Sequence, residues 1–168
     1  MTAPRALARA APEPRPPLRR ADGSPVVSPR IMARLRSLTE AIFATAAGPP
    51  PAARVDWVVA EVEDVLAHAG AQMRWTMAAA TLVIVWIAPL FVGRLGSLAS
   101  LPFRERVRAL AALEASALGG PVLAVKALLC ILYYEHPDAA AEVGFDAECL
   151  GLPSPAALGP AAGAEGVA

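Results

Sequence analysis

Few residues of this chain have the type and spacing that catalysis or metal binding requires. His68 and His136 are far apart, and neither lies in a His-x-x-x-His or Cys-x-x-Cys pattern. Cys130 lies inside an apolar run, Cys149 lies near the C-terminal end, and no serine sits in a Gly-x-Ser-x-Gly turn. The sequence therefore predicts no catalytic residue, no metal site and no cofactor-binding site in this chain.

Lys126 and three acidic residues remain as candidates for proton transfer. Lys126 is the single charge of an apolar segment. A catalytic amine of lowered pKa is one interpretation, but a lysine whose ammonium reaches water or a carboxylate is the favoured one. Glu61, Glu63 and Asp64 are close in sequence, yet no apolar pocket is evident that would shift their pKa values. We expect them on a solvated helix face.

Arginine residues cluster at two places, although the fifteen basic and fifteen acidic residues give a net charge of zero. Residues 1–36 hold eight arginines against two acidic residues, and a second cluster comprises Arg104, Arg106 and Arg108. No glycine-rich loop or stacking aromatic accompanies the second cluster, so a solvated face with Arg–Glu pairing is favoured over a phosphate site. We expect no nucleic-acid partner.

The elements that would position these residues are predicted to be helices. With 56% hydrophobic and 18% charged residues among 168, the composition predicts an all-α fold, a compact bundle of about five helices. Gly119 and Gly120 are predicted to end the fourth helix in a left-handed conformation. Apolar residues recur at helical spacing from about 28 to 45, 55 to 69, 74 to 94, 102 to 118, and from Pro121 onward.

Composition divides the chain into three parts. Residues 1–29 are rich in proline and arginine and predict a disordered arm, residues 30–150 a helical domain, and residues 151–168 a flexible Ala/Gly/Pro tail. No continuous apolar stretch follows the basic start, so no signal peptide is predicted. We expect a cytoplasmic chain, with association to the inner membrane left open.

The segment of residues 75–93 has two interpretations. It contains no charge between Arg74 and Arg94, and this gap is about the length that spans a bilayer. Trp75 near one end favours a single-pass membrane anchor, because tryptophan is enriched at membrane interfaces. Pro89 and Gly93 near the other end favour the central buried helix of a bundle. The buried interpretation is preferred, and the anchor or scaffold remains the alternative.

Several short motifs follow one another within residues 30–150. They are Leu101-Pro102 with Arg106, Glu114-x-Ser116, Val125-Lys126-x-Leu128, Tyr133-Tyr134-x-x-Pro137 and Gly144-Phe145. In this order they resemble the small-subunit family of gluconate 2-dehydrogenase (subunit 3), which is also found as the N-terminal helical domain of long-chain alcohol oxidases. Many members carry a twin-arginine export signal, whereas none is predicted from the first residues of this sequence.

The resemblance implies a non-catalytic accessory subunit. Its partner would be a large FAD-containing oxidoreductase of the glucose-methanol-choline type, acting on an alcohol, sugar or sterol, with the FAD held by the partner. Aromatic residues are enriched at interfaces but also close helix cores, and both interpretations stay open. The candidate partner-interface residues are Trp75, Trp86, Phe91, Phe103, Tyr133, Tyr134, His136 and Phe145.

Overall fold

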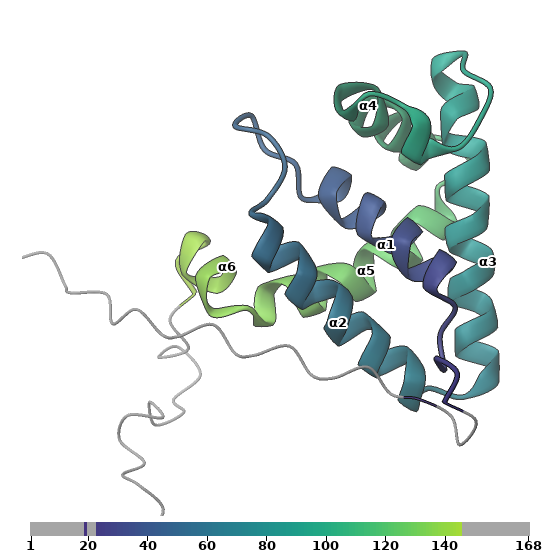
Figure 1. Cartoon of the computed structure of the whole chain (residues 1–168). Helices are drawn as coiled ribbons and strands as arrows, with labels where there is room; N and C mark the ends of the chain where they lie inside the picture. Colours follow the sequence, from purple (N-terminus) through teal and green to yellow (C-terminus); the bar gives the residue numbers. More distant parts are fainter. Residues whose placement is uncertain (1–18, 20–22, 146–168) are drawn as a thin grey trace, which may run out of the picture.

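The structure, a computed structural model, describes Arg19 and residues 23–145 (Figure 1). Most of the predicted arm and all of the predicted tail lie outside the described residues. Within them the all-α prediction is confirmed, because helices and their connections account for the fold and no strand is formed. The elements are α1 (Pro29–Ile42), α2 (Ala52–His68), α3 (Ala71–Ile87), η1 (Ala88–Val92), η2 (Leu98–Ser100), α4 (Phe103–Glu114), α5 (Gly120–Glu135) and α6 (Pro137–Glu142).

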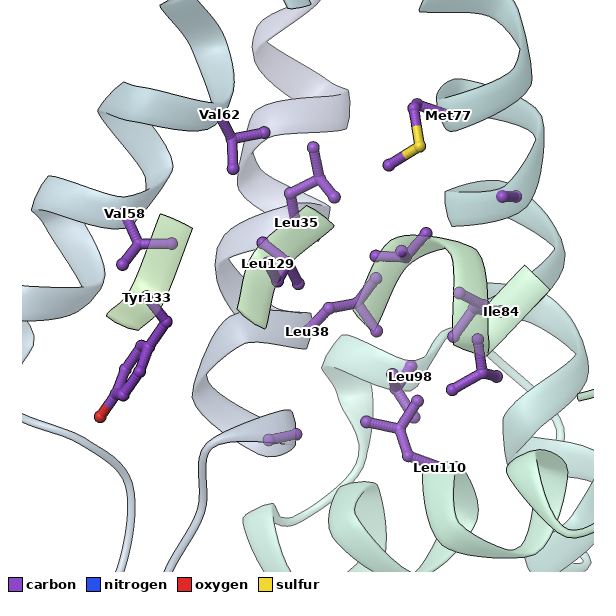
Figure 2. Close-up of a cluster of buried hydrophobic side chains, with 14 of the residues drawn as sticks. Leu35, Leu38, Val58, Val62, Met77, Ile84, Leu98, Leu110, Leu129 and Tyr133 are labelled. Carbon is purple, nitrogen blue, oxygen red and sulfur yellow. The ribbon is translucent and has the colours of Figure 1, made fainter. Parts of the chain in front are cut away.

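Helix α1 lies across the middle of the bundle, between α2 and α3, and α5 passes behind it (Figure 1). Its apolar residues Leu35 and Leu38 point into the same cluster as Leu129 of α5 (Figure 2). The period of the apolar residues in α1 places these two leucines on one face, which packing against neighbouring helices buries. The cluster also includes Val58, Val62, Met77, Ile84, Leu98, Leu110 and Tyr133.

Proline residues lie at the starts of several helices. Pro29, Pro121 and Pro137 occupy the first turns of α1, α5 and α6, where a missing backbone N–H costs nothing. Pro51 directly precedes α2. The fold thus uses proline to fix where helices begin.

The connection between α4 and α5 differs from the prediction. Helix α4 ends at Glu114 instead of continuing to Leu118, which is exposed. Gly119 has φ −69°, so it does not adopt the predicted left-handed conformation. A Cβ atom at Gly119 would lie 2.4 Å from the carbonyl oxygen of Glu114. Glycine is required here by close backbone approach, which the sequence pattern did not indicate.

Two residues that were expected to be exposed to solvent are buried. Val27 is buried and belongs to the core, so the packed part of the chain begins before Arg30. Glu61 of α2 is buried as well, whereas Glu63 and Asp64 are partly exposed. The prediction of a fully solvated acidic face is therefore wrong for Glu61, because the apolar stripe of α2 is wide enough to include its position.

Candidate functional site

An aromatic cluster forms where the C-terminal part of α5 meets the end of α1. Tyr133 is 6% exposed, and its ring stacks on that of Phe43 with the centroids 3.8 Å apart and the planes within 7°. Tyr134 meets both rings edge-on, at 6.4 Å from Phe43 and 5.4 Å from Tyr133. The pair of tyrosines therefore joins α5 to α1, with one ring inside and the other outside.

Arg54 of α2 forms hydrogen bonds and an ion pair that hold α5 and α6 together at this corner. Its Nη1 donates to Tyr133 Oη at 2.9 Å and to Glu142 Oε2 at 2.8 Å, and its Nη2 donates to Glu142 Oε1 at 2.7 Å. The hydrogen bonds from Arg54 lower the pKa of the Glu142 carboxyl, and those with Glu142 raise the pKa of the buried Arg54 guanidinium despite its burial. One arginine thus links α2, α5 and α6.

His136 holds the start of α6. It is 4% exposed, and its Nδ1 accepts a hydrogen bond from the backbone N–H of Asp138 at 3.3 Å. Its ring lies edge-on to Trp57, with the centroids 5.1 Å apart. Tyr133 and His136 are thus enclosed by their own chain, which corrects their assignment to a partner surface. They close the end of the core, the structural alternative that the sequence had left open.

Tyr134 and Phe145 remain exposed at this corner. Together with Ile131 and Val143 they line a hollow of about 320 Å³ between the end of α5 and α6, which we call the α5–α6 hollow. Ile131 and Val143 are also exposed apolar side chains, and sequence reasoning missed them. Helical spacing on α5 brings Ile131 and Tyr134 to one face, and that signal could have found Ile131.

The other four predicted interface residues lie elsewhere. Trp75 and Trp86 are 76% and 51% exposed on α3, and Phe91 is exposed on η1. Phe103 at the start of α4 is partly buried, with the Arg106 guanidinium 5.6 Å from its ring centroid. The eight candidates therefore do not form one site: the structure separates the α3 group from the corner of α5 and α6.

The charged candidates are engaged in contacts between helices. Lys126 Nζ donates to both carboxylate oxygens of Glu114, at 2.8 and 3.1 Å, so the predicted carboxylate partner is confirmed. Arg106 Nη1 donates to Ser37 Oγ at 2.9 Å and to Glu40 Oε2 at 3.3 Å. The prediction of pairing within the arginine cluster is therefore wrong for Arg106, which pairs with α1 instead.

Cys130 is a partly buried free thiol. Burial raises its pKa, and the nearby Lys126 charge opposes this effect only in part. A raised pKa leaves less thiolate at neutral pH and weakens the sulfur as a nucleophile. Among the described residues, no group of three or more His, Cys, Asp or Glu side chains is arranged to hold a metal ion.

Helix α3 and η1 together form the feature of the described chain that resembles a membrane segment. Ala71–Val92 is long enough and apolar enough to cross a bilayer, and an 18-residue window within it has a mean hydropathy of 2.0. Only 39% of that window is buried in the bundle. The α3 prediction is therefore met in part: one face packs into the core and the other is open.

Comparison of the chain with protein-family models, with curated proteins and with solved structures gives no match. The resemblance to the gluconate 2-dehydrogenase small subunits therefore stays a prediction. The residues that carry it have structural roles here, since Glu114 and Lys126 join α4 to α5 and Tyr133 bonds to Arg54.

Proposed function

We propose that this chain is a non-catalytic accessory subunit. It binds and stabilises a large FAD-dependent oxidoreductase of the glucose-methanol-choline type, which acts on an alcohol, a sugar or a sterol. The observation that carries the proposal is the α5–α6 hollow, an apolar and exposed depression at the Tyr-Tyr-x-x-Pro and Gly-Phe motifs. Exposed apolar patches with aromatic anchors are characteristic of protein interfaces.

The internal contacts of the corner support this proposal physically. Arg54, Tyr133 and Glu142 fix α5 and α6 relative to α2, so the hollow is held in shape before a partner arrives. A preformed surface binds with a smaller loss of conformational entropy. Tyr134 then offers a large apolar ring with a polar tip, which suits an interface core.

The test is purification of the tagged full-length chain from its native host, in mild detergent and without detergent. Mass spectrometry and the absorbance spectrum of the eluate identify what accompanies it. We expect a larger flavoprotein with a flavin spectrum in both conditions. A double substitution, Ile131→Asp with Tyr134→Ala, should remove that flavoprotein, whereas Leu118→Asp, at an exposed leucine outside the hollow, should retain it.

The same purification contains the result that contradicts the proposal. Elution of the chain alone in both conditions would contradict the proposal. Elution of the flavoprotein with the double variant would show that the α5–α6 hollow does not bind the partner. Because Tyr134 also meets the rings of Phe43 and Tyr133, circular dichroism and urea unfolding of each variant are compared with the wild type, and we expect the same helical content. Loss of the partner can then be assigned to the surface.

A single-pass membrane anchor or scaffold, spanning through residues 75–93, is the second candidate. The length and hydropathy of Ala71–Val92 favour it. The burial of Met77, Thr81 and Ile84 argues against it, because a spanning α3 would have to leave its packing against α1 and α5. Retention of the chain in membranes after alkaline carbonate extraction is the result that would favour the anchor.

A further inference from the structure

The open face of α3 is mainly apolar from Trp75 onward, with Thr76 as an exposed polar residue on it. From there on, the large exposed apolar side chains of α3 are Trp75, Leu82, Val83 and Trp86, and their separations of seven, one and three residues place them on one stripe of the helix. Leu90 follows them on η1. A surface helix normally turns charged residues outward. Here no charged residue occurs between Arg74 and Arg94. The α3 surface consists of Trp75, Leu82, Val83, Trp86 and Leu90.

The loop that follows η1 adds further exposed apolar side chains at one end of α3. Gly93 and Gly96 have φ of +69° and +129°, and between them Leu95 is 92% exposed, with Phe91 also exposed nearby in the chain. Figure 1 shows this loop projecting at the end of the bundle that α3 and α4 share. Transfer of this exposed leucine side chain from water into an apolar medium would lower the free energy.

The same end of the molecule is basic. The segment of residues 93–113 holds four arginines and a single acidic residue, Glu105. Arg94 donates to Glu105 at 3.1 Å, and α4, which packs against η1, carries exposed Arg104 and Arg108. Arg94 and Arg106 pair with Glu105 and Glu40, respectively, so the net positive charge beside this loop comes from the exposed Arg104 and Arg108. This combination is complementary to a layer that has anionic groups outside and hydrocarbon beneath.

We propose that the α3 surface rests on a bilayer of anionic phospholipid, with the helix lying along the membrane surface. Leu95 and Phe91 enter the boundary between headgroups and acyl chains, and Arg94, Arg104 and Arg108 contact the phosphates. Trp75 and Trp86 lie at the depth that tryptophan prefers. The buried face of α3, including Ile84, keeps its packing, which a spanning helix would lose. This proposal does not depend on the flavoprotein partner.

The test is sedimentation of the full-length chain with vesicles, using phosphatidylcholine alone or an equal mixture with phosphatidylglycerol. We expect binding to the anionic vesicles to exceed binding to the neutral ones by at least about tenfold at low salt, and to fall at high salt. Leu95→Asp should reduce binding about tenfold. The triple variant Arg94→Ala, Arg104→Ala, Arg108→Ala should remove the preference for anionic vesicles. Leu118→Asp, an exposed leucine in the α4–α5 connection, should bind as the wild type does.

Three results would overturn the proposal. One is equal sedimentation with both kinds of vesicle, or none. Another is vesicle binding that resists alkaline carbonate, which indicates a spanning helix. The third is a dimer, seen by analytical ultracentrifugation without lipid, that Trp86→Asp dissociates, because the α3 surface would then be covered by a second copy. Each variant replaces an exposed side chain, and circular dichroism verifies that it folds.

Discussion

A single side chain, Arg54, determines how the C-terminal corner is built. It is almost completely buried, yet it reaches Tyr133 and Glu142, which follow it by 79 and 88 residues in the chain. A buried guanidinium is stable only when carboxylates and hydroxyls accept its protons. The exposed Glu142 therefore stabilises the fold through the buried charge that it neutralises.

Replacement of Glu142 by Gln should lower the free energy of unfolding by about 1–2 kcal/mol, because Arg54 would keep its charge without its carboxylate. The value is at the low end of the range for charged hydrogen bonds, since Glu142 is 61% exposed and water screens it. Urea unfolding at neutral pH measures the change. Glu135→Gln on the exposed face of α5 is the control and should have little effect.

The pH dependence of this stability has a definite sign. The folded pKa of Glu142 is lowered, so its contribution is present at pH values above the ordinary pKa of a glutamate and is lost as the pH falls through the lowered folded value. The wild type should therefore lose more stability in acid than Glu142→Gln does. Parallel acid sensitivity in both proteins would contradict this assignment.

Sequence reasoning identified some of these residues and not others, for a physical reason. Lys126 was expected to reach water or a carboxylate, and Glu114, only 12 residues away, supplies the carboxylate. The sequence did not decide whether Tyr133 is buried, because Phe43 and Arg54, which enclose it, come from helices distant in the chain. Local patterns predict contacts within and between successive helices, whereas the long-range arrangement decides which aromatic ring is inside.

At the scale of elements, α3 carries a polar group that its surroundings do not satisfy. Thr81 is 0% exposed, and its hydroxyl has no hydrogen-bond partner among the described residues. Thr39 of α1 is equally buried, but its Oγ1 donates to the carbonyl oxygen of Leu35 at 2.9 Å. Since an unsatisfied buried hydroxyl costs free energy, α3 is less stable in this bundle than its apolar composition implies.

Thr81→Val should raise the free energy of unfolding by about 0.5–2 kcal/mol, because it removes the unsatisfied hydroxyl and keeps the side-chain shape. Thr76→Val, at an exposed position of the same helix, should change stability by less than about 0.5 kcal/mol. Thr39→Val should lower it by about 1 kcal/mol. Thermal and urea unfolding of the three variants measure these differences, and a destabilised Thr81→Val would show that the hydroxyl is bonded.

The connection between α4 and α5 gives a second prediction at this scale. Gly119→Ala would place Cβ against backbone atoms of Glu114 and Ser116, which cannot move without displacing the end of α4. We expect a loss of about 1–3 kcal/mol. At Gly120 no atom lies within 4 Å of a built Cβ, so Gly120→Ala should stay within about 0.5 kcal/mol of the wild type. Equal effects at both positions in urea unfolding would contradict the close approach.

At the scale of the whole molecule, the bundle is closed at one end by the segment before α1. Val27 packs into the core, and with Val26 it borders a hollow of about 370 Å³ shared with Leu66 of α2 and Trp75 of α3. The segment was predicted to be part of a disordered arm because proline and arginine dominate it. One buried valine in a short stretch is too weak a pattern to indicate packing.

Val27→Ala should lower the free energy of unfolding by about 1–2 kcal/mol, since it removes two buried methyl groups where α1, α2 and α3 meet. Val143→Ala, at an exposed valine of the same size, should change it by less than about 0.5 kcal/mol. Urea unfolding measures both. A wild-type stability for Val27→Ala would show that the segment does not contribute to the core.

The helical class, the approximate number of helices and several of their starts follow from apolar periodicity and proline. The division of the open apolar residues into the α3 surface and the α5–α6 hollow does not. That division depends on which face of each helix the bundle covers, and α3 and α5 are apolar on nearly every side. When a helix is apolar on all sides, the spacing of its apolar residues does not show which face packs against the core.

The three tryptophans give the molecule a built-in set of optical probes. Trp57 lies in the core against His136, whereas Trp75 and Trp86 face outward. A soluble quencher such as acrylamide therefore reaches two emitters in the native protein and spares the third. Replacing Trp75 and Trp86 by phenylalanine leaves a protein whose fluorescence reports the state of its interior, and replacing Trp57 leaves one that reports what touches its surface.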